Sequence, residues 1–373
     1  MGLNQRIVVK LGTSTLTAGT QRISKSRMVD LVRQVAQVHS LGCEIVLVSS
    51  GAIAAGREAL GYPELPKHIP KKQMLAAIGQ PRLMARYAEF FAIYDKKVAQ
   101  VLLTRTDLAD RRRNMNARNA FQALLSQEVI PVVNENDTVA TEEIRFGDND
   151  SLSAQVASLI EADILILLTD QEGLFPGDPK QDANALLIHE VPSVEFQDDL
   201  LLAAGGSNSG LGTGGMATKL HAADLARHTG IQVFIASGEE PDVIVRIAQG
   251  EHLGTCFIPM QNKLESRKRY LLAGEQAQGS LVVDAGAARA LAHGGSLLPV
   301  GITQVQGEFD RGDTVRVLNT AGKVIALGMS NYASRDLSSV CGRQSAELES
   351  ILGYSFGDEI IHRNHMVLMR YDG

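Results

Sequence analysis

The run Ile164-Leu165-Ile166-Leu167-Leu168 is apolar at every position. A strand with one buried face alternates apolar and polar side chains, whereas a parallel strand that is covered on both faces is apolar throughout. The run therefore predicts a parallel strand with both faces covered. Similar runs occur elsewhere in the first two thirds of the chain: Ile7–Val9, Glu44–Val48, Val98–Leu103, Ile130–Val133 and Ile231–Ala236.

Amphipathic stretches of helical length lie between these runs. They are Met28–His39, Gln73–Phe91, Asn114–Gln127 and Leu152–Glu161. Alternation of strands and helices is typical of βαβ units, in which helices cover both faces of a parallel sheet. The sequence therefore predicts an α/β fold, a three-layer αβα sandwich around a mainly parallel open sheet.

The character of the sequence changes near residue 258. Residues 259–278 are polar and contain a small basic cluster, and we interpret them as a linker. Short strand patterns with turn signals between them follow: Leu281–Val283, Ile302–Val305, Thr314–Leu318, Val324–Leu327 and His365–Leu368. The prediction is an α/β domain over residues 1–258 and a small β-rich domain over residues 279–373.

The composition limits the classes of protein that need consideration. Of 373 residues, 45% are hydrophobic and 21% charged, as in an ordinary soluble globular protein. The net charge of −6 argues against nucleic-acid binding through bulk positive charge. The three cysteines form no CxxC pair, which excludes a disulfide scaffold and fits a reducing compartment. Without an apolar run of ~20 residues or a signal-peptide segment, we expect a cytoplasmic protein and no membrane partner.

Four clusters of candidate binding residues follow predicted strands, where open α/β sheets bind their ligands. The first is Val9-Lys10-Leu11-Gly12-Thr13-Ser14, with a lysine at a strand end. The second is Ser49-Ser50-Gly51, whose backbone N–H groups and hydroxyls are suited to an anion at a helix N-terminus. The alternatives are an edge lysine beside a turn and ordinary helix capping by Ser50.

The third cluster consists of two turns rich in Asn and Asp, Asn134-Glu135-Asn136-Asp137 and Gly147-Asp148-Asn149-Asp150-Ser151. These side chains offer both donors and acceptors, which suits the ammonium and carboxylate groups of an amino acid. The alternative is a pair of surface loops in which Asp150 or Ser151 caps a helix.

The fourth cluster is the glycine-rich stretch Ser207–Lys219. Gly210, Gly212 and Gly215 satisfy GxGxxG, but no strand precedes them, which argues against a dinucleotide-binding fingerprint. A P-loop is excluded because Leu220 follows Lys219. The stretch instead predicts a loop that opens a helix, where backbone N–H groups and the lysine converge on one anion. A flexible linker is the alternative.

These four clusters, in this order, resemble the amino acid kinase family, in particular its members that act on glutamate and carry a C-terminal PUA domain. The segments that carry the resemblance are Val9–Ser14, Ser49–Gly56, Leu102–Thr104, Pro131–Asp137, Phe146–Asp150, Leu167–Leu174 and Gly212–Lys219. In the second domain, Val283–Ala287, Gly295–Ile302 and Phe309–Asp313 resemble a PUA fold. The resemblance extends over essentially the whole chain.

The resemblance implies transfer of the γ-phosphoryl group of ATP to the side-chain carboxylate of L-glutamate, the first step of proline biosynthesis. Mg²⁺ would accompany ATP, bound mainly through its phosphates and with no certain protein ligand. The implied catalytic residues are Lys10, Lys219 and Asp150. The implied glutamate-binding residues are Ser50, Gly51, Asn134, Asp137, Asp148 and Asn149. The implied ATP-binding residues are Lys10, Thr169, Asp170, Leu211, Gly212, Thr213, Gly214, Gly215, Met216, Ala217 and Lys219.

Further expectations rest on the resemblance alone. They are feedback inhibition by proline, a homo-oligomer (dimer or tetramer), and hand-over of the labile product to glutamyl phosphate reductase. Two alternatives stay open, a different carboxylate substrate such as acetylglutamate or aspartate, and RNA binding by the second domain. Residues 279–373 contain eight Lys and Arg against ten Asp and Glu, which disfavours RNA binding.

Overall fold

The computed structural model describes residues 3–62, 68–140, 149–176, 185–193, 215–260 and 277–369. Its internal contacts divide the chain into two compact units. One comprises Met1–Ala109 and Ala120–Lys263, and the other comprises Asp110–Asn119 and Leu264–Gly373. The predicted linker 259–278 lies mostly outside the described residues, so the boundaries drawn from the sequence stay predictions.

The first unit is built on an eight-stranded sheet of order β3-β4-β2-β1-β5-β7-β8-β6. The strands are β1 Arg6–Leu11, β2 Glu44–Ser49, β3 Val98–Leu103, β4 Ile130–Glu135, β5 Ile164–Thr169, β6 Glu190–Val191, β7 Gln232–Ser237 and β8 Thr255–Phe257. All neighbouring strands are parallel except β7 and β8. The predicted, mainly parallel sheet is confirmed. The run Ile164–Leu168 lies in β5 and is buried throughout.

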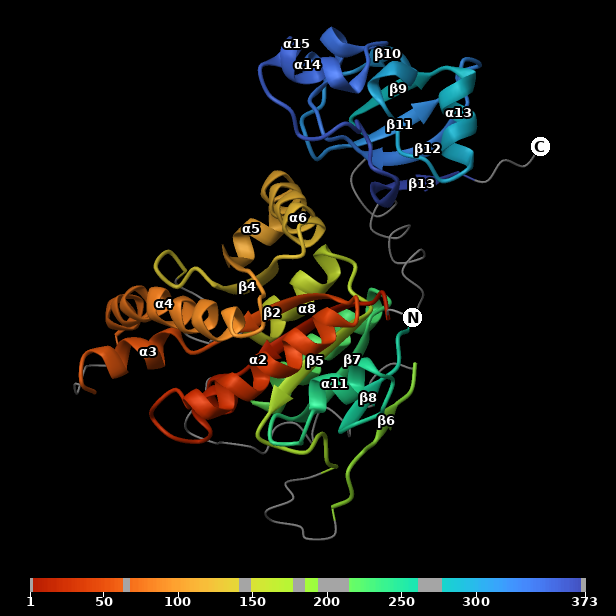
Figure 1. Ribbon diagram of the computed structural model, residues 1–373. Coiled ribbons are helices and arrows are strands. Elements are labelled where there is room, and N and C mark those ends of the chain that lie inside the picture. Colours follow the sequence, from red (N-terminus) through yellow and green to blue (C-terminus); the bar gives the residue numbers. More distant parts are fainter. Residues whose placement is uncertain are drawn as a thin grey trace. The chain divides into compact units, whose positions relative to one another are not determined.

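Helices cover both faces of this sheet (Figure 1). The helices of the first unit are α1 Thr13–Thr17, α2 Lys25–Ser40, α3 Ala52–Ala59, α4 Ile69–Ala92, α5 Arg105–Ala109, α8 Asn149–Leu159, α10 Met216–His228 and α11 Val243–Ala248. Helix α6, Arg111–Ser126, belongs to both units, because its residues up to Asn119 are part of the second. Side chains of α2 and α11 share one hydrophobic core with alternate residues of β1, β2 and β5, while α8 and α10 pack together at the other face. The three-layer αβα sandwich is therefore confirmed.

The second unit has its own sheet, of order β10-β9-β11-β12-β13. The strands are β9 Gly279–Val283, β10 Ile302–Gln306, β11 Thr314–Leu318, β12 Val324–Met329 and β13 Met366–Leu368. Its helices are α13 Ala285–Ala292, α14 Ser334–Val340 and α15 Leu348–Leu352, with 3₁₀ turns η2 Pro299–Gly301, η3 Ser345–Glu347 and η4 Arg363–His365. A separate core that includes Leu281, Val315 and Ile361 holds this unit together. The β-rich character is as predicted, and the three helices are additional.

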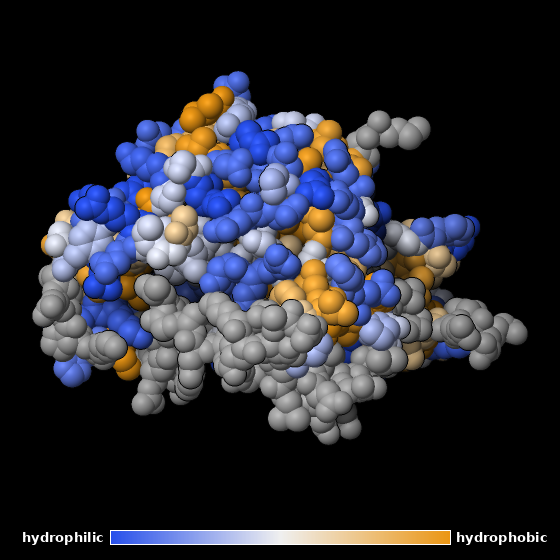
Figure 2. Space-filling view, turned by 90° about the horizontal axis from the view of Figure 1, so that it is seen from below, coloured by the Kyte–Doolittle hydropathy of each residue, from blue (hydrophilic) through white to orange (hydrophobic). Residues whose placement is uncertain are grey.

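No helix of the described residues is long and apolar enough to cross a membrane. On the face of the molecule in Figure 2, hydrophilic residues cover most of the coloured surface and apolar residues occur in small groups. Scattered exposed apolar residues of this kind are normal on a globular protein.

Helices α3 and α4 lie side by side and touch through two glycines (Figure 1). A Cβ atom added to Gly79 of α4 would lie 1.8 Å from the carbonyl oxygen of Ala52 in α3. A Cβ atom added to Gly56 of α3 would lie 2.0 Å from the carbonyl oxygen of Leu75 in α4. Only glycine permits this backbone contact, which fixes α4 against the start of α3.

We expect Gly79→Ala to lower the free energy of unfolding by about 3 kcal/mol, because the added methyl group collides with backbone that cannot rotate away. Urea denaturation followed by circular dichroism measures the change. Gly286→Ala in α13 is the control, since its added Cβ would meet only a side-chain oxygen, at 3.2 Å. We expect this control to remain within about 1 kcal/mol of the wild type, and an equal loss in both variants would contradict the packing argument.

Candidate active site

The carboxyl ends of the parallel strands meet at one edge of the sheet. The strand order reverses beside β1, because β2, β4 and β3 lie on one side of it and β5 and β7 on the other. Such a reversal opens a crevice at the carboxyl ends of the central strands, where α/β proteins bind ligands. Lys10 lies near the end of β1, and Thr169 ends β5. Ser50 follows β2 directly, and Asn134 is the second-last residue of β4.

Two lysines hold one carboxylate between them at this edge. The Nζ atom of Lys10 lies 2.5 Å from Oδ1 of Asp150, and the Nζ atom of Lys219 lies 3.3 Å from Oδ2. The Thr218 hydroxyl donates a hydrogen bond to the same Oδ2 atom at 2.7 Å. Lys10, Asp150 and Lys219 are exposed by only 5%, 1% and 6%. The structure thus brings together the three residues that the resemblance implied as catalytic, and we call them the lysine–aspartate triad.

The charges of the triad do not balance. Burial alone would raise the pKa of Asp150, but the positive charges of Lys10 and Lys219 outweigh it and hold that pKa well below its usual range. Burial, and next the charge of Lys10, lowers the pKa of Lys219, while Asp150 and Asp170 oppose this change. With both lysines protonated, two positive charges face one negative charge in a site of low polarity. An anionic ligand would complete the neutralisation.

The local sequence explains how the triad assembles. Val9 and Leu11 belong to the core that faces α2 and α11. Because successive strand residues point to opposite faces, Lys10 between them faces α8 and α10. Asp150 lies in the first turn of α8 and Lys219 in the first turn of α10. Lys10 is thus buried on a central strand, and the alternative of an edge lysine is wrong.

A second cluster, which we call the amide cluster, lies beside the triad. The Nδ2 atom of Asn149 donates to the hydroxyl of Ser50 at 2.8 Å and to Oδ1 of Asn134 at 3.0 Å. Asn149 and Asn134 are buried. Gly51 occupies the cap position of α3 in a left-handed conformation (φ 105°) without a side-chain cap, so Ser50 does not cap the helix. Three residues that the resemblance implied as glutamate-binding therefore meet.

Asp137 lies in the turn that follows β4. Burial raises its pKa to about 6, against an opposing effect of the Lys72 charge. A carboxyl group held in such a place loses the stabilisation that water gives its charged form. A ligand with a positive group would restore that stabilisation.

The implied ATP residues are only partly described. Thr169 is buried, and its hydroxyl donates to the exposed Asp170 carboxylate at 3.1 Å. Asp170 lies close enough to Lys219 to act on its charge. Gly215 precedes α10, Met216 is buried in its first turn and Ala217 is exposed. Asp148, Leu211, Gly212, Thr213 and Gly214 lie outside the described residues, as does the glycine-rich loop before Gly215 with its linker alternative.

Several residues that complete the site were missed in the sequence. Thr218 donates a hydrogen bond to Asp150. Its position beside Lys219 at the start of a helix could have indicated this role. Gln80 of α4 accepts a hydrogen bond from Nδ2 of Asn134 at 2.9 Å. Tyr87 of α4 pairs with the hydroxyl of Ser49 at 2.7 Å. No sequence motif marks these two residues of α4.

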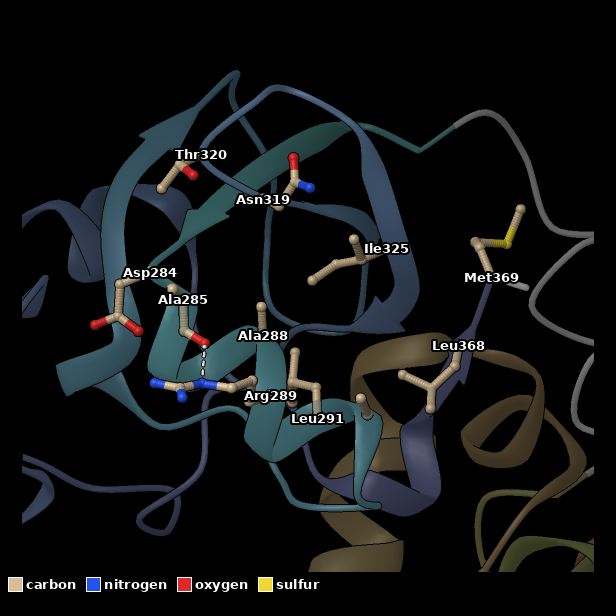
Figure 3. A pocket seen from close by; sticks show the side chains of 11 residues that line it. Asp284, Ala285, Ala288, Arg289, Leu291, Asn319, Thr320, Ile325, Leu368 and Met369 are labelled. Atoms are coloured by element: carbon tan, nitrogen blue, oxygen red, sulfur yellow. Dashed lines mark hydrogen bonds between the residues drawn. The ribbon is translucent and has the colours of Figure 1, made fainter. Parts of the chain in front are cut away.

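Among the described residues, no group of three or more His, Cys, Asp or Glu side chains could hold a metal ion. The second unit contains an open pocket of about 720 Å³ beside α13 (Figure 3). The apolar side chains of its floor include Ala288, Leu291, Ile325 and Leu368. Asp284 on its rim accepts the N–H of Ala287 at 2.7 Å, and Arg289 donates to the carbonyl of Ala285 at 3.1 Å. Both charged side chains thus bond to α13 itself. Asp284 is half-buried and Arg289 exposed, so the pocket lacks the buried charge found at the sheet edge.

The fold and the site define an α/β protein with a carboxylate held between two buried lysines at the carboxyl edge of its sheet. The amino acid kinase family model matches residues 5–237, and the PUA domain model matches residues 279–352. The chain belongs to the amino acid kinase family, and its second part is a PUA domain.

Relatives match almost the full length. A protein named glutamate 5-kinase from Shewanella oneidensis is 54% identical over 98% of this chain and 98% of its own. The protein of the same name from Shewanella amazonensis is 52% identical over 99% of this chain and 97% of its own. A third, from Photobacterium profundum, is 53% identical over 98% of this chain and 96% of its own.

The half-buried Asp137 and the buried Asp150 should affect stability with opposite signs. Because the pKa of Asp137 is raised to about 6, its charge opposes folding above that pH, and the cost disappears as the pH falls toward the ordinary value near 4. We expect Asp137→Asn to raise the melting temperature at pH 7.5 and to raise it less at pH 5. Differential scanning calorimetry without ligands measures both values.

Asp150→Asn is the matched control. The pKa of Asp150 is lowered, so its charge favours folding above the ordinary pKa of aspartate, and the stabilisation is lost only in strong acid. We expect this variant to melt at a lower temperature at pH 7.5, because Lys10 and Lys219 lose the carboxylate between them. Shifts of the same sign in both variants would contradict the electrostatic description of the site.

Proposed function

We propose that the protein transfers the γ-phosphoryl group of ATP to the side-chain carboxylate of L-glutamate, which yields L-glutamyl 5-phosphate and ADP. The observation that carries the proposal is the contiguity of the lysine–aspartate triad and the amide cluster, which Asp150 and Asn149 join as consecutive residues. The first is suited to a phosphoryl group and the second to an amino acid. The names of the full-length relatives support the same substrate.

The chemistry requires no general base. A glutamate side chain has an ordinary pKa near 4.3 and is ionised at neutral pH. Its oxygen attacks the γ-phosphorus, the bond from that phosphorus to the β–γ bridging oxygen breaks, and ADP leaves with the electron pair. Phosphoryl transfer depends on positioning and on neutralisation of the equatorial oxygens. Lys10 and Lys219 supply that neutralisation, while Asp150 orients both ammonium groups.

The amide cluster supplies recognition of the amino acid. Oδ1 of Asn149 is buried and has no hydrogen-bond partner among the residues that the structure describes. A buried acceptor without a donor is costly, and an ammonium group provides the missing donor. Asp137 provides a negative charge for the same group. We therefore assign Asn149 and Asp137 to the α-ammonium of glutamate, with Ser50, Gly51, Asn134 and Asp148 completing the pocket.

The nucleotide would lie on the other side of the triad. Thr169 ends β5 there and Asp170 follows it, while Gly215 precedes α10 and Met216, Ala217 and Lys219 lie in its first turn. We assign these residues to the nucleotide, together with Leu211, Gly212, Thr213 and Gly214. Mg²⁺ retains several waters and binds mainly through substrate phosphates, so it would arrive with ATP and neutralise phosphate charge. The buried lysines fit such a complex because they contact phosphate oxygens without competing as metal ligands.

We extend the proposal to the setting of the reaction. We infer that the protein is cytoplasmic and forms a homo-oligomer, either a dimer or a tetramer. We also infer that proline inhibits it and that it passes its acyl phosphate to glutamyl phosphate reductase. The three cysteines are free thiols, which suits a reducing compartment. An acyl phosphate hydrolyses readily, which favours rapid use by a following enzyme. RNA binding by the second domain is not favoured, because acidic residues outnumber basic ones there.

Trapping of the product with hydroxylamine tests reaction and substrate together. The assay converts an acyl phosphate into a coloured hydroxamate, and L-glutamate, N-acetylglutamate and L-aspartate are compared at equal concentration. We expect ATP-dependent hydroxamate with L-glutamate and at least tenfold less with the other two acids. Preference for another acid would replace the substrate, and absence of hydroxamate with all three would overturn the proposed reaction.

Lys219→Ala should lower kcat by ~10²-fold or more, because this ammonium acts on charge that grows in the transition state. The variant should fold, since Lys10 still neutralises Asp150. Steady-state kinetics with saturating glutamate and ATP measure the change. Lys97→Ala, an exposed lysine before β3, is the control and should retain wild-type kcat. A Lys219 variant with near-normal kcat would remove that residue from the catalytic set.

A further inference from the structure

Helix α4 presents three polar side chains to the substrate side of the sheet. Gln73, Gln80 and Tyr87 are spaced seven residues apart, which places them two turns apart on one face of the helix. Their partners lie after β4, within β4 and at the end of β2. The contacts are Gln73 Nε2 to the carbonyl oxygens of Thr138 and Ala140 (both 3.2 Å), Asn134 Nδ2 to Gln80 Oε1 (2.9 Å), and Tyr87 Oη with Ser49 Oγ (2.7 Å).

Three of these four partners are, or directly adjoin, a residue that we assigned to glutamate. Ser49 precedes Ser50, Thr138 follows Asp137, and Asn134 is itself a member of the amide cluster. The contact between Gly79 and α3 fixes the position of α4 against α3, and Gly79 is one residue before Gln80. A single helix therefore determines where the strand ends β2 and β4 place their side chains.

The direction of the hydrogen bonds in the amide cluster is fixed by the backbone. The N–H of Glu135 donates to Asn134 at 2.9 Å, and only the oxygen of that amide can accept it. The nitrogen of Asn134 must then point to Gln80, which must present its oxygen. Asn149 approaches the oxygen of Asn134, so it must present its nitrogen there.

This order determines the atom that Asn149 offers to a ligand. Both hydrogens of Asn149 Nδ2 are used, one on Asn134 and one on Ser50. Its Oδ1 atom remains as a buried acceptor, which suits an ammonium group. If Gln80 could not accept, the Asn134 nitrogen would be a buried donor without a partner, and a turn of that amide would break its bond to Asn149.

We propose that Gln80 is a positioning residue for the amino-acid substrate, acting through Asn134 and Asn149. This inference rests on the proposed function, because it explains how the same pocket holds the ammonium group. Gln80 is buried, and in the described part of the chain it bonds neither to the triad nor to Thr218. It therefore sets the affinity for glutamate and leaves the transfer step unchanged.

Kinetics of Gln80→Met and Gln80→Glu test the proposal. Methionine keeps the length and volume of the side chain but accepts hydrogen bonds only weakly, whereas glutamate keeps an acceptor oxygen. We expect Gln80→Met to raise KM for glutamate about tenfold, with kcat within about twofold of the wild type and KM for ATP unchanged. Gln80→Glu should restore KM for glutamate to within about threefold of the wild type.

Gln100→Met is the matched control. The Nε2 atom of Gln80 donates to Oε1 of Gln100 at 3.3 Å, but Gln100 is exposed and water can replace it. We expect this variant to be unchanged. The proposal is overturned if Gln80→Met leaves KM for glutamate unchanged, if it changes KM for both substrates equally, or if Gln80→Glu fails to restore it. A wild-type protein that does not phosphorylate glutamate overturns the proposed function itself, and this inference with it.

Discussion

A buried carboxylate between two buried ammonium groups is the interaction on which the rest of the site depends. Asp150 is held by Lys10 and Lys219 from opposite sides, so that each of its oxygens faces one lysine. Buried charges are stable only when they are paired, and with both lysines protonated this group contains one positive charge more than it can pair internally. We therefore propose that an anion completes this site. For a phosphoryl group in transfer, the surplus charge exists before the substrate arrives and needs no reorganisation.

The triad places strict demands on the fold. Lys10 reaches it only because β1 points alternate residues to opposite faces, and because its neighbours fill the core on the other side. Asp150 and Lys219 come from the starts of two helices that pack against each other. Such an arrangement needs a central parallel strand with helices on both faces. The order of strands in this sheet, which reverses beside β1, provides it.

Much of this was predictable because the signals are local. Apolar runs such as Ile164–Leu168 marked the buried strands, and the carboxyl-end rule then placed Lys10 and Asn134 near each other. Gln80 could not be predicted in the same way. It looks like any polar residue of an amphipathic helix, and its partner lies 54 residues away, so its role exists only in the tertiary structure. Helix α13, in contrast, has a local signal in the sequence. Asp284 caps the helix Ala285–Ala292, but the short strand patterns around it led us to predict strands alone.

The first turn of α8 joins the two clusters that we propose for recognition and for transfer. Asn149 and Asp150 are consecutive, yet Asn149 belongs to the amide cluster and Asp150 to the triad. A shift of α8 by a fraction of an ångström would therefore disturb both groups at once. Positioning of the reacting atoms dominates catalysis where little covalent assistance is needed. A rigid link between the two clusters is consequently more useful here than a catalytic base. Helix α4 supports this link through Asn134 and Asn149, and Lys10 and Lys219 support it through Asp150.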